Sequence, residues 1–70
     1  MIPLNRHRRL KKGDVVYVFN HPEYGECEVI EIYKNLNVSG YRRTFYRLTW
    51  RDKPLYEVDV FLFSELGEIE

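Results

Sequence analysis

The amino-acid sequence predicts an all-β protein built as one small five-stranded barrel. The chain has 70 residues, which is enough for a single domain with a small core. Hydrophobic residues make up 44% and aromatic residues 16%, and this composition is typical of folded chains rather than disordered ones. The apolar residues alternate in short segments between glycine and proline turns, without the sustained i, i+3, i+4 spacing of an α-helix.

The expected strands follow one another closely along the chain. Segment 14–19, rich in β-branched and aromatic residues, and segment 26–33 predict a first hairpin across a turn that contains proline and glycine. The apolar phase of segment 26–33 slips once after Val29, when Ile30 and Ile32 take over, and this slip predicts a β-bulge or a sharp bend. The remaining elements are a loop at 34–40, a strand at 41–51, a turn at 52–54, a strand at 55–63, a single helical turn at 64–67 and a closing strand at 68–70.

Alternation also predicts the register between the strands at 41–51 and 55–63. A three-residue turn at 52–54 brings the two apolar faces together, because it pairs Trp50 with Tyr56, Leu48 with Val58 and Tyr46 with Val60. The same register places Arg47 opposite Asp59 on the outer face. The expected core contains Val16, Val18, Val29, Ile32, Tyr46, Leu48, Trp50, Val58, Val60 and Leu66.

The charges alternate in blocks, although the formal net charge is zero. Residues 1–12 carry five basic residues and no acid, and residues 13–34 carry five acids against one lysine. Residues 35–56 carry five basic residues against one acid, and residues 57–70 carry five acids and no basic residue. The blocks either pair across neighbouring strands or bring basic residues to one face that meets nucleic acid or an acidic protein.

Residues 1–11 are expected to form a basic arm ahead of a barrel at 12–70. No regular strand pattern places an acid beside this arm, so it is either a phosphate-binding segment or a solvated, mobile terminus. The predicted nucleic-acid-binding residues are Arg6, Arg8, Arg9, Lys11 and Lys12, with Arg42, Arg43 and Lys53 in support.

Aromatic and acidic residues predict a second kind of surface. The expected register places Phe45 opposite Phe61 and Phe63 opposite Arg43, so these phenylalanines either enter the core of a bent barrel or contact a partner protein. The tyrosines allow three interpretations: stacking on bases, a cage for a methylated amine, or ordinary core packing. The predicted protein-interface residues are Tyr24, Phe45, Phe61, Phe63, Glu23, Glu26, Glu28 and Glu31.

The single cysteine and the two histidines provide little for catalysis or metal binding. Cys27 cannot close an intrachain disulfide, which suits a reducing compartment, and we expect it to be a small buried apolar residue. The histidines do not stand at a zinc-ligand spacing from it. We therefore expect no metal, cofactor or small-molecule substrate, no enzymatic activity, no signal peptide or membrane span, and a cytoplasmic location.

Segments 12–18 and 21–32 resemble the Gly-Asp-x-Val … His-Pro-x-(aromatic)-Gly-x-Gly-x-Val-x-x-Ile pattern of small SH3-like, Tudor-like barrels. Such barrels include the carboxy-terminal domain of UvrD/PcrA/Rep-type helicases, the RNA-polymerase-interacting domain of CarD-type regulators and KOW modules. The resemblance covers residues 12–69, with four additional residues at 17–20 and with Cys27 in place of a second glycine. It implies an SH3-like barrel that binds RNA polymerase, nucleic acid, ribosomal components or peptide tails.

These observations predict a non-catalytic binding module. Its expected target is nucleic acid or a nucleic-acid machine of transcription, repair or translation, with the basic arm on the phosphates. The alternative is a protein–protein adaptor or inhibitor, such as a small phage-type protein or an accessory subunit, that uses the acidic and aromatic surfaces.

Overall fold

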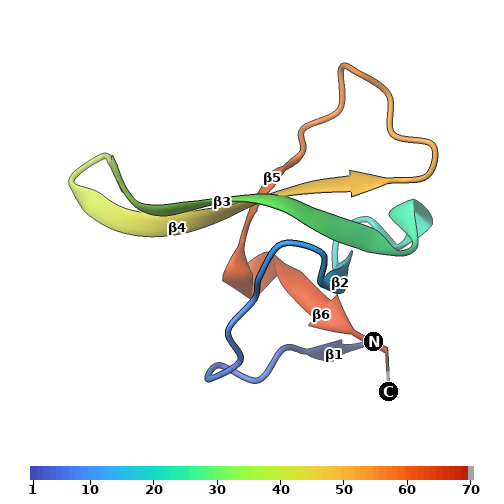
Figure 1. Ribbon diagram of the computed structural model, residues 1–70, viewed down its shortest axis with the longest axis horizontal. Helices are drawn as coiled ribbons and strands as arrows, with labels where there is room; N and C mark the ends of the chain where they lie inside the picture. Colours follow the sequence, from blue (N-terminus) through green and yellow to red (C-terminus); the bar gives the residue numbers. More distant parts are fainter. Residues whose placement is uncertain (70) are drawn as a thin grey trace.

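The computed structural model describes residues 1–69, apart from the side chain of Val38, and consists of one antiparallel sheet of six strands (Figure 1). The strands are β1 (Ile2–Pro3), β2 (Val15–Val18), β3 (Cys27–Val38), β4 (Tyr41–Trp50), β5 (Val60–Leu62) and β6 (Leu66–Glu68). Two short 3-10 turns, η1 (Pro22–Tyr24) and η2 (Phe63–Glu65), are the only helical elements in the described residues. The all-β prediction is therefore confirmed, and no helix in the described part has the length and apolarity to cross a bilayer.

Strand β2 joins the two halves of the sheet. Its first residues, Val15 and Val16, pair with β3, whereas Tyr17 and Val18 pair with β6. The spatial order of the strands is β1-β6-β2-β3-β4-β5. Because β2 changes partner halfway along its length, β6 and β1 form a layer below β3 and β4 in Figure 1. The buried side chains fill the space between the layers.

The sheet is not a closed barrel in the described residues. The edge strands β1 and β5 pair with β6 and β4 respectively and not with each other. Segment 55–63 was expected to form a full strand, yet only β5 remains in the sheet. Pro54 lacks an N–H group for a ladder, and the chain around it makes turns instead, in which the N–H of Glu57 donates to the carbonyl of Pro54 at 3.2 Å.

The register between β4 and β5 differs by one residue from the expected one. Tyr46 lies opposite Phe61 rather than Val60, and Arg47 lies opposite Val60 rather than Asp59. A one-residue shift exchanges the two faces of a strand, so Phe61 enters the core with 5% of its surface exposed. Burial of the larger aromatic side chain removes more apolar area from water, which favours this register.

Most of the expected core is confirmed. Val16, Val18, Val29, Leu48, Trp50 and Leu66 are buried, and Ile32 and Tyr46 are half-buried against them. The prediction was wrong for Val58, which is 69% exposed, and Val60 is only half-buried. Leu4 and Leu10 are buried although the sequence analysis did not place them in the core. Cys27 is buried as expected, and Phe61 takes the core position, one of the two places expected for it.

The phase slip in β3 corresponds to a β-bulge, one of the two alternatives that the sequence allowed, and the strand is longer than expected. The register with β4 shifts between Val29 and Glu31, where the apolar phase slips at Ile30. Segment 34–40 is not a loop, because β3 continues to Val38 and β4 starts at Tyr41. The two residues between them, Ser39 and Gly40, have φ angles of 52° and 82°, as a two-residue type I′ hairpin turn requires.

The basic N-terminal segment packs on the sheet rather than standing apart as an arm before residue 12. Leu4 and Leu10 are buried in the core, and β1 pairs with β6. Gly67 permits this pairing, because a Cβ atom there would lie 2.7 Å from the carbonyl oxygen of Ile2 and 2.8 Å from the ring of Phe19. The apolar residues between the arginines thus determine where the basic residues lie.

The observed register predicts that alanine substitutions at Leu48 and Val58, both expected in the core, lower the free energy of unfolding by unequal amounts. Leu48→Ala removes a fully buried side chain and lowers the free energy of unfolding by about 2–5 kcal/mol. Val58→Ala changes it by less than about 0.5 kcal/mol, because Val58 is exposed. Urea unfolding followed by Trp50 fluorescence measures both, and comparable losses in the two variants would contradict the observed register.

Candidate functional site

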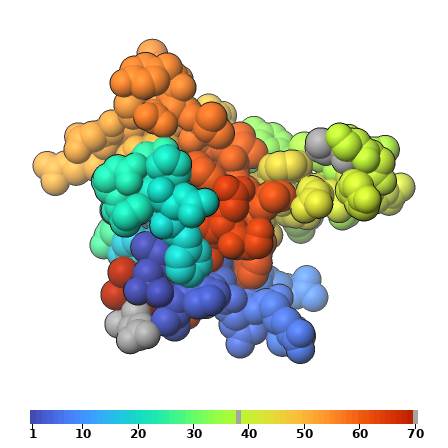
Figure 2. Space-filling view, turned by 180° about the vertical axis from the view of Figure 1, so that it is seen from behind, coloured from blue at the N-terminus to red at the C-terminus, as the bar shows by residue number. Residues whose placement is uncertain are grey.

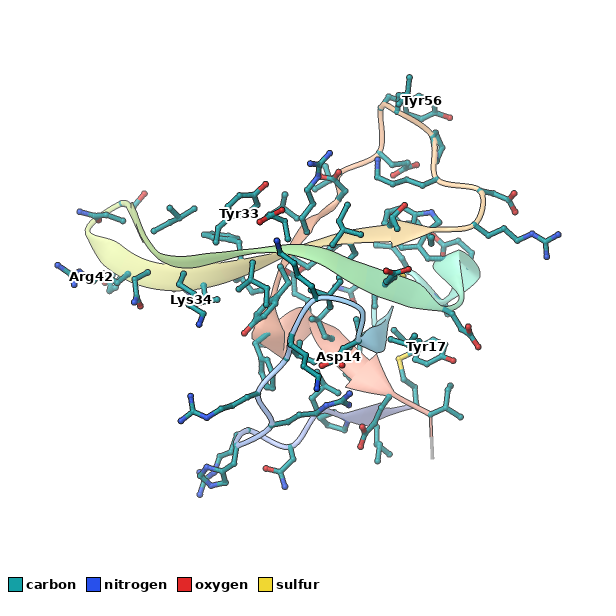
Figure 3. All side chains as sticks on the ribbon, in the orientation of Figure 1. Asp14, Tyr17, Tyr33, Lys34, Arg42 and Tyr56 are labelled. Carbon is teal, nitrogen blue, oxygen red and sulfur yellow. The ribbon has the colours of Figure 1, made fainter. Side chains whose placement is uncertain are left out.

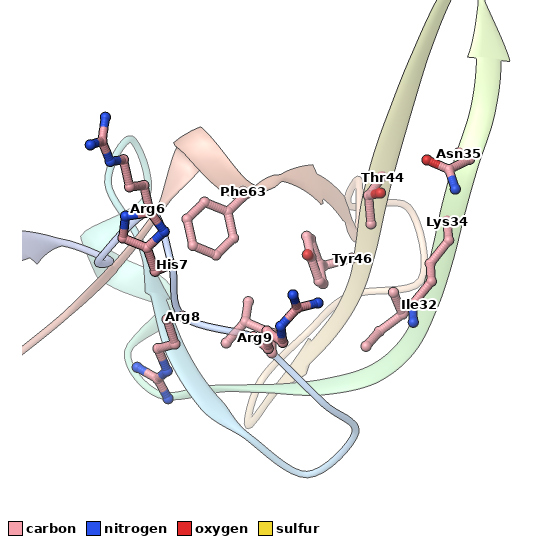
Figure 4. Close-up of a pocket in the computed structure, with 11 residues that line it drawn as sticks. Arg6, His7, Arg8, Arg9, Ile32, Lys34, Asn35, Thr44, Tyr46 and Phe63 are labelled. Carbon is pink, nitrogen blue, oxygen red and sulfur yellow. The ribbon is translucent and has the colours of Figure 1, made fainter.

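A cleft of about 510 Å³ lies between the N-terminal segment and the strands β3 and β4 (Figure 4). The N-terminal segment forms one wall, β3 and β4 form the other, and η2 contributes one ring. Its lining residues are Arg6, His7, Arg8, Arg9, Leu10, Ile32, Lys34, Asn35, Thr44, Tyr46 and Phe63. We call this hollow the basic cleft.

The basic cleft has cationic walls and no carboxylate among its described lining residues. Arg6, Arg9 and Lys34 are exposed and form no ion pair with a described residue. The fourth cation, Arg8, is held by Glu68 at 2.8 Å from Nη1 to Oε2. Three positive charges are therefore free to meet an anionic ligand in the cleft.

The basic cleft has an apolar and aromatic floor. The rings of Tyr46 and Phe63 are half-buried against the core, with their centroids 6.2 Å apart and an interplanar angle of 55°. Leu10 and Ile32 extend this floor. The rings are not parallel, so they do not form one flat platform for two successive stacked bases.

A second bulge in β3 shapes the wall of the basic cleft. The ladder shifts between Tyr33 and Leu36, so that Lys34 and Asn35 stand opposite the single residue Thr44 of β4. Asn35 has a φ angle of 56°, a left-handed conformation that asparagine tolerates better than most residues. All three of these bulge residues line the cleft.

The structure brings only some of the predicted nucleic-acid-binding residues together. Arg6, Arg8 and Arg9 line the basic cleft. Lys11 is exposed outside it, and Lys12 pairs with Glu31 at 3.3 Å. Arg42 and Arg43 are exposed near the hairpin tip, away from the cleft lining.

Lys53 does not fit the predicted phosphate-binding role. Its Nζ lies 3.7 Å from Asp59 and 5.7 Å from the centroid of the Trp50 ring, and only 15% of its side chain is exposed. Asp59 also accepts from Nε of Arg47 at 3.0 Å, so the predicted Arg47–Asp59 contact forms although the two residues are not cross-strand partners. Burial raises the pKa of Asp59, but Arg47 and, more weakly, Lys53 lower it, so that the pKa of Asp59 lies below its ordinary value.

The predicted protein-interface residues do not form one patch. Phe61 is in the core, Phe63 lines the basic cleft, and Phe45 is half-buried. Glu23, Glu26 and Glu28 are exposed, whereas Glu31 pairs with Lys12. The one-residue register shift separates the phenylalanines that the sequence placed together.

Tyr24 belongs to an aromatic stack rather than to an exposed turn. Its ring stacks on Trp50 at 3.8 Å between centroids and on His21 at 4.5 Å. Its hydroxyl donates to Glu57 at 3.2 Å. Burial and the nearby carboxylate of Glu57 raise the pKa of Tyr24. Together with Phe61 at 6.5 Å, this stack covers one end of the core.

The cleft residues that the sequence did not indicate come mainly from β3 and β4. The sequence analysis did not indicate Lys34, Asn35 or Thr44 as site residues. It placed Tyr46 in the core and did not indicate that its ring also lines the cleft. One signal was present, because residues 32–51 contain five basic residues and no acid. The sequence could not show that this segment lies beside Arg6 and Arg9, which requires the N-terminal segment to fold back.

Cys27 is buried, as expected. Its Sγ donates weakly to the carbonyl of Gly25 at 3.5 Å. Burial raises the pKa of the thiol from an ordinary 9.0 to about 11, so the nucleophilic thiolate is scarce near neutral pH. His21 is paired with Glu23 at 2.9 Å, and the described residues hold no group of three or more side chains suited to bind a metal ion.

No known protein family, curated protein or solved structure gives a significant match to this chain. The geometry and charge of the basic cleft are therefore the features of this protein that point to its function.

The buried thiol gives a direct chemical prediction. A pKa of about 11 lowers the thiolate fraction near pH 8 about 100-fold relative to a thiol of pKa 9. Native protein is therefore expected to react with Ellman's reagent at pH 8 at least about 100-fold more slowly than the same chain in concentrated urea. Equal rates in the two conditions would show that Cys27 is accessible.

Proposed function

We propose that this protein is a non-catalytic nucleic-acid-binding module whose basic cleft holds the phosphate backbone. The observation that carries the proposal is the meeting of Arg6, Arg9 and Lys34 in a hollow of about 510 Å³ without a lining carboxylate. These cations come from the two acid-free stretches of the chain, residues 1–13 and 32–51. A polyanion is the ligand class that uses such a site most fully.

The ion pairs elsewhere support this assignment. Lys12, Arg47 and Lys53 are each matched by an acid, so their fields are weakened locally. The cations that remain unmatched on the N-terminal wall and on β3 face the same hollow. Arginine also offers several N–H donors in a fixed geometry that fits phosphate oxygens.

The backbone rather than stacked bases is the proposed contact in the cleft. Tyr46 and Phe63 are inclined to each other by 55° and are partly covered by the core. They give the cleft an apolar floor between its cationic walls.

We also propose that the fold is of the SH3-like, Tudor-like type. The spatial order β6-β2-β3-β4-β5 and the single helical turn η2 immediately before the last strand support this proposal. Strand β1 is then an addition at the edge of β6. A binding role in transcription, repair or translation is the corresponding biological setting, with the cytoplasm as the location.

Salt-dependent binding tests the proposed function. Fluorescence anisotropy of labelled single- and double-stranded DNA and RNA, titrated at several salt concentrations, is expected to give affinities that fall steeply with salt. Arg6→Ala, Arg9→Ala and Lys34→Ala each remove a cleft cation, and each is expected to reduce the magnitude of the log–log salt slope by about 1.

Arg51→Ala is the matched control. Arg51 is also exposed, but it follows the far end of β4 and does not line the basic cleft. Its variant is expected to keep the wild-type slope. Absence of binding at low salt, or equal losses in the control and the cleft variants, would contradict the proposal.

A second candidate function is that of a protein-binding adaptor, and one observation favours it. The segment between β4 and β5 exposes Leu55 completely, Tyr56 to 86% and Val58 to 69%. This segment projects at the top of the molecule in Figure 1. Exposed apolar side chains of this kind mark protein contacts, and a protein that binds no nucleic acid at low salt would favour this candidate.

A further inference from the structure

The far part of the β3–β4 hairpin projects from the rest of the fold. Strand β2 pairs with β3 only at Cys27 and Glu28, and β5 pairs with β4 only between Phe45 and Arg47. The hairpin from Lys34 to Arg43 therefore has no third strand on either side among the described residues. In Figure 1 the hairpin extends beyond the other strands of the sheet. In Figure 2, which shows the molecule from behind, it projects above the N-terminal segment.

This projecting hairpin is exposed and basic. Residues 34–37 and 39–43 are all exposed. The segment 34–43 carries Lys34, Arg42 and Arg43 and contains no acid. An exposed two-stranded ribbon without acids does not contribute to the core and does not pair with acidic neighbours, so its composition points to an anionic partner.

The two faces of the hairpin carry different side chains. Asn37 and Arg42 are direct cross-strand partners, and Arg42 is on the face of β4 that continues through Thr44 and Tyr46 into the basic cleft. Arg43 is on the opposite face, where its guanidinium lies 5.7 Å from the ring of Tyr41. Figure 3 shows Lys34 on the side of the N-terminal segment and Tyr33 on the other side.

We propose that this hairpin enters the major groove of duplex DNA, with Asn37 and Arg42 toward the base edges and the basic cleft on the flanking phosphates. This inference rests on the proposed function and specifies its ligand. The face of the hairpin that carries Asn37 and Arg42 continues into the basic cleft. One duplex therefore contacts both the hairpin and the cleft. Base-edge contacts lie on the hairpin, and phosphate contacts lie on the N-terminal wall.

The dimensions of the hairpin agree with this placement. Two paired strands lie about 4.8 Å apart, and with their side chains they fit the B-form major groove, which is about 12 Å wide. On β4, the Cα atoms of Tyr41 and Thr44 are about 10 Å apart along the strand, which exceeds the groove depth of about 8.5 Å. The major groove of duplex RNA is deep and narrow, so the same hairpin does not enter it.

The chemistry of the cross-strand pair suits base recognition. The guanidinium of Arg42 offers paired donors to O6 and N7 of guanine, and the amide of Asn37 offers a donor and an acceptor to N7 and N6 of adenine. Because the two residues are direct cross-strand partners, they contact neighbouring bases. Arg43, on the opposite face, is directed away from those bases.

Selection from a random-sequence pool of duplex DNA tests this proposal. The wild-type protein is expected to enrich a short motif that contains guanine and adenine, and to bind the selected DNA duplex more tightly than single strands or duplex RNA of the same sequence. The Asn37→Ala/Arg42→Gln variant removes two base contacts and is expected to lose roughly 30-fold or more in affinity for the selected duplex, while it keeps the salt-sensitive binding of unselected DNA.

Leu36→Ala/Arg43→Gln is the matched control, because it also changes one uncharged residue and removes one arginine near the tip, but on the opposite face. This variant is expected to keep the enriched motif. Equal losses in the two hairpin variants, preference for single strands, or absence of any enriched motif would overturn the groove placement.

The same measurements separate this inference from the proposed function. If unselected DNA still binds with salt dependence and cleft variants weaken that binding, the proposed function stands although the groove placement fails. If neither selected nor unselected nucleic acid binds at low salt, both fail together.

Discussion

The fold depends on strand β2, which has four residues and two different partners. Val15 and Val16 hold it to β3, and Tyr17 and Val18 hold it to β6. The side chains of Val16 and Val18 point into the space that this change of partner encloses, and both are almost fully buried. Because a domain of this size has few buried residues, the loss of this shared strand would separate the two layers and expose most of the core.

The basic cleft is a consequence of the bent sheet and of two leucines. Leu4 and Leu10 anchor the N-terminal segment in the core, so that Arg6 and Arg9 between them lie along the open side of β3 and β4. Gly67 gives β1 the close approach that completes this anchoring. Positive charge concentrates there because no acid lines the cleft, whereas Lys12 lies beside Glu31, and Arg47 and Lys53 lie beside Asp59. The function we propose thus follows from where the apolar anchors place the cations.

The same principle explains where the structure places the residues that the sequence analysis grouped together. The basic character of residues 6–9 was readable from the sequence, and these residues line the cleft. Lys53 was grouped with them by charge alone, but Asp59 and the Trp50 ring hold it. The three phenylalanines were grouped by an alternation that assumed a regular strand over 55–63. The turns around Pro54 end that regularity, and Phe61 and Phe63 consequently lie in different environments.

Local patterns in the sequence determined the all-β class, the segments that form β2, β4 and the first half of β3, the irregularity at Ile30 and the burial of Cys27. These features depend on residue alternation and turn chemistry, which act over a few neighbouring residues. Only the tertiary structure decided the register of β5, the packing of the N-terminal segment and the meeting of Arg9 with Lys34 across the basic cleft. Each of these depends on how distant apolar side chains compete for a small core, and that competition has no local signature in the sequence.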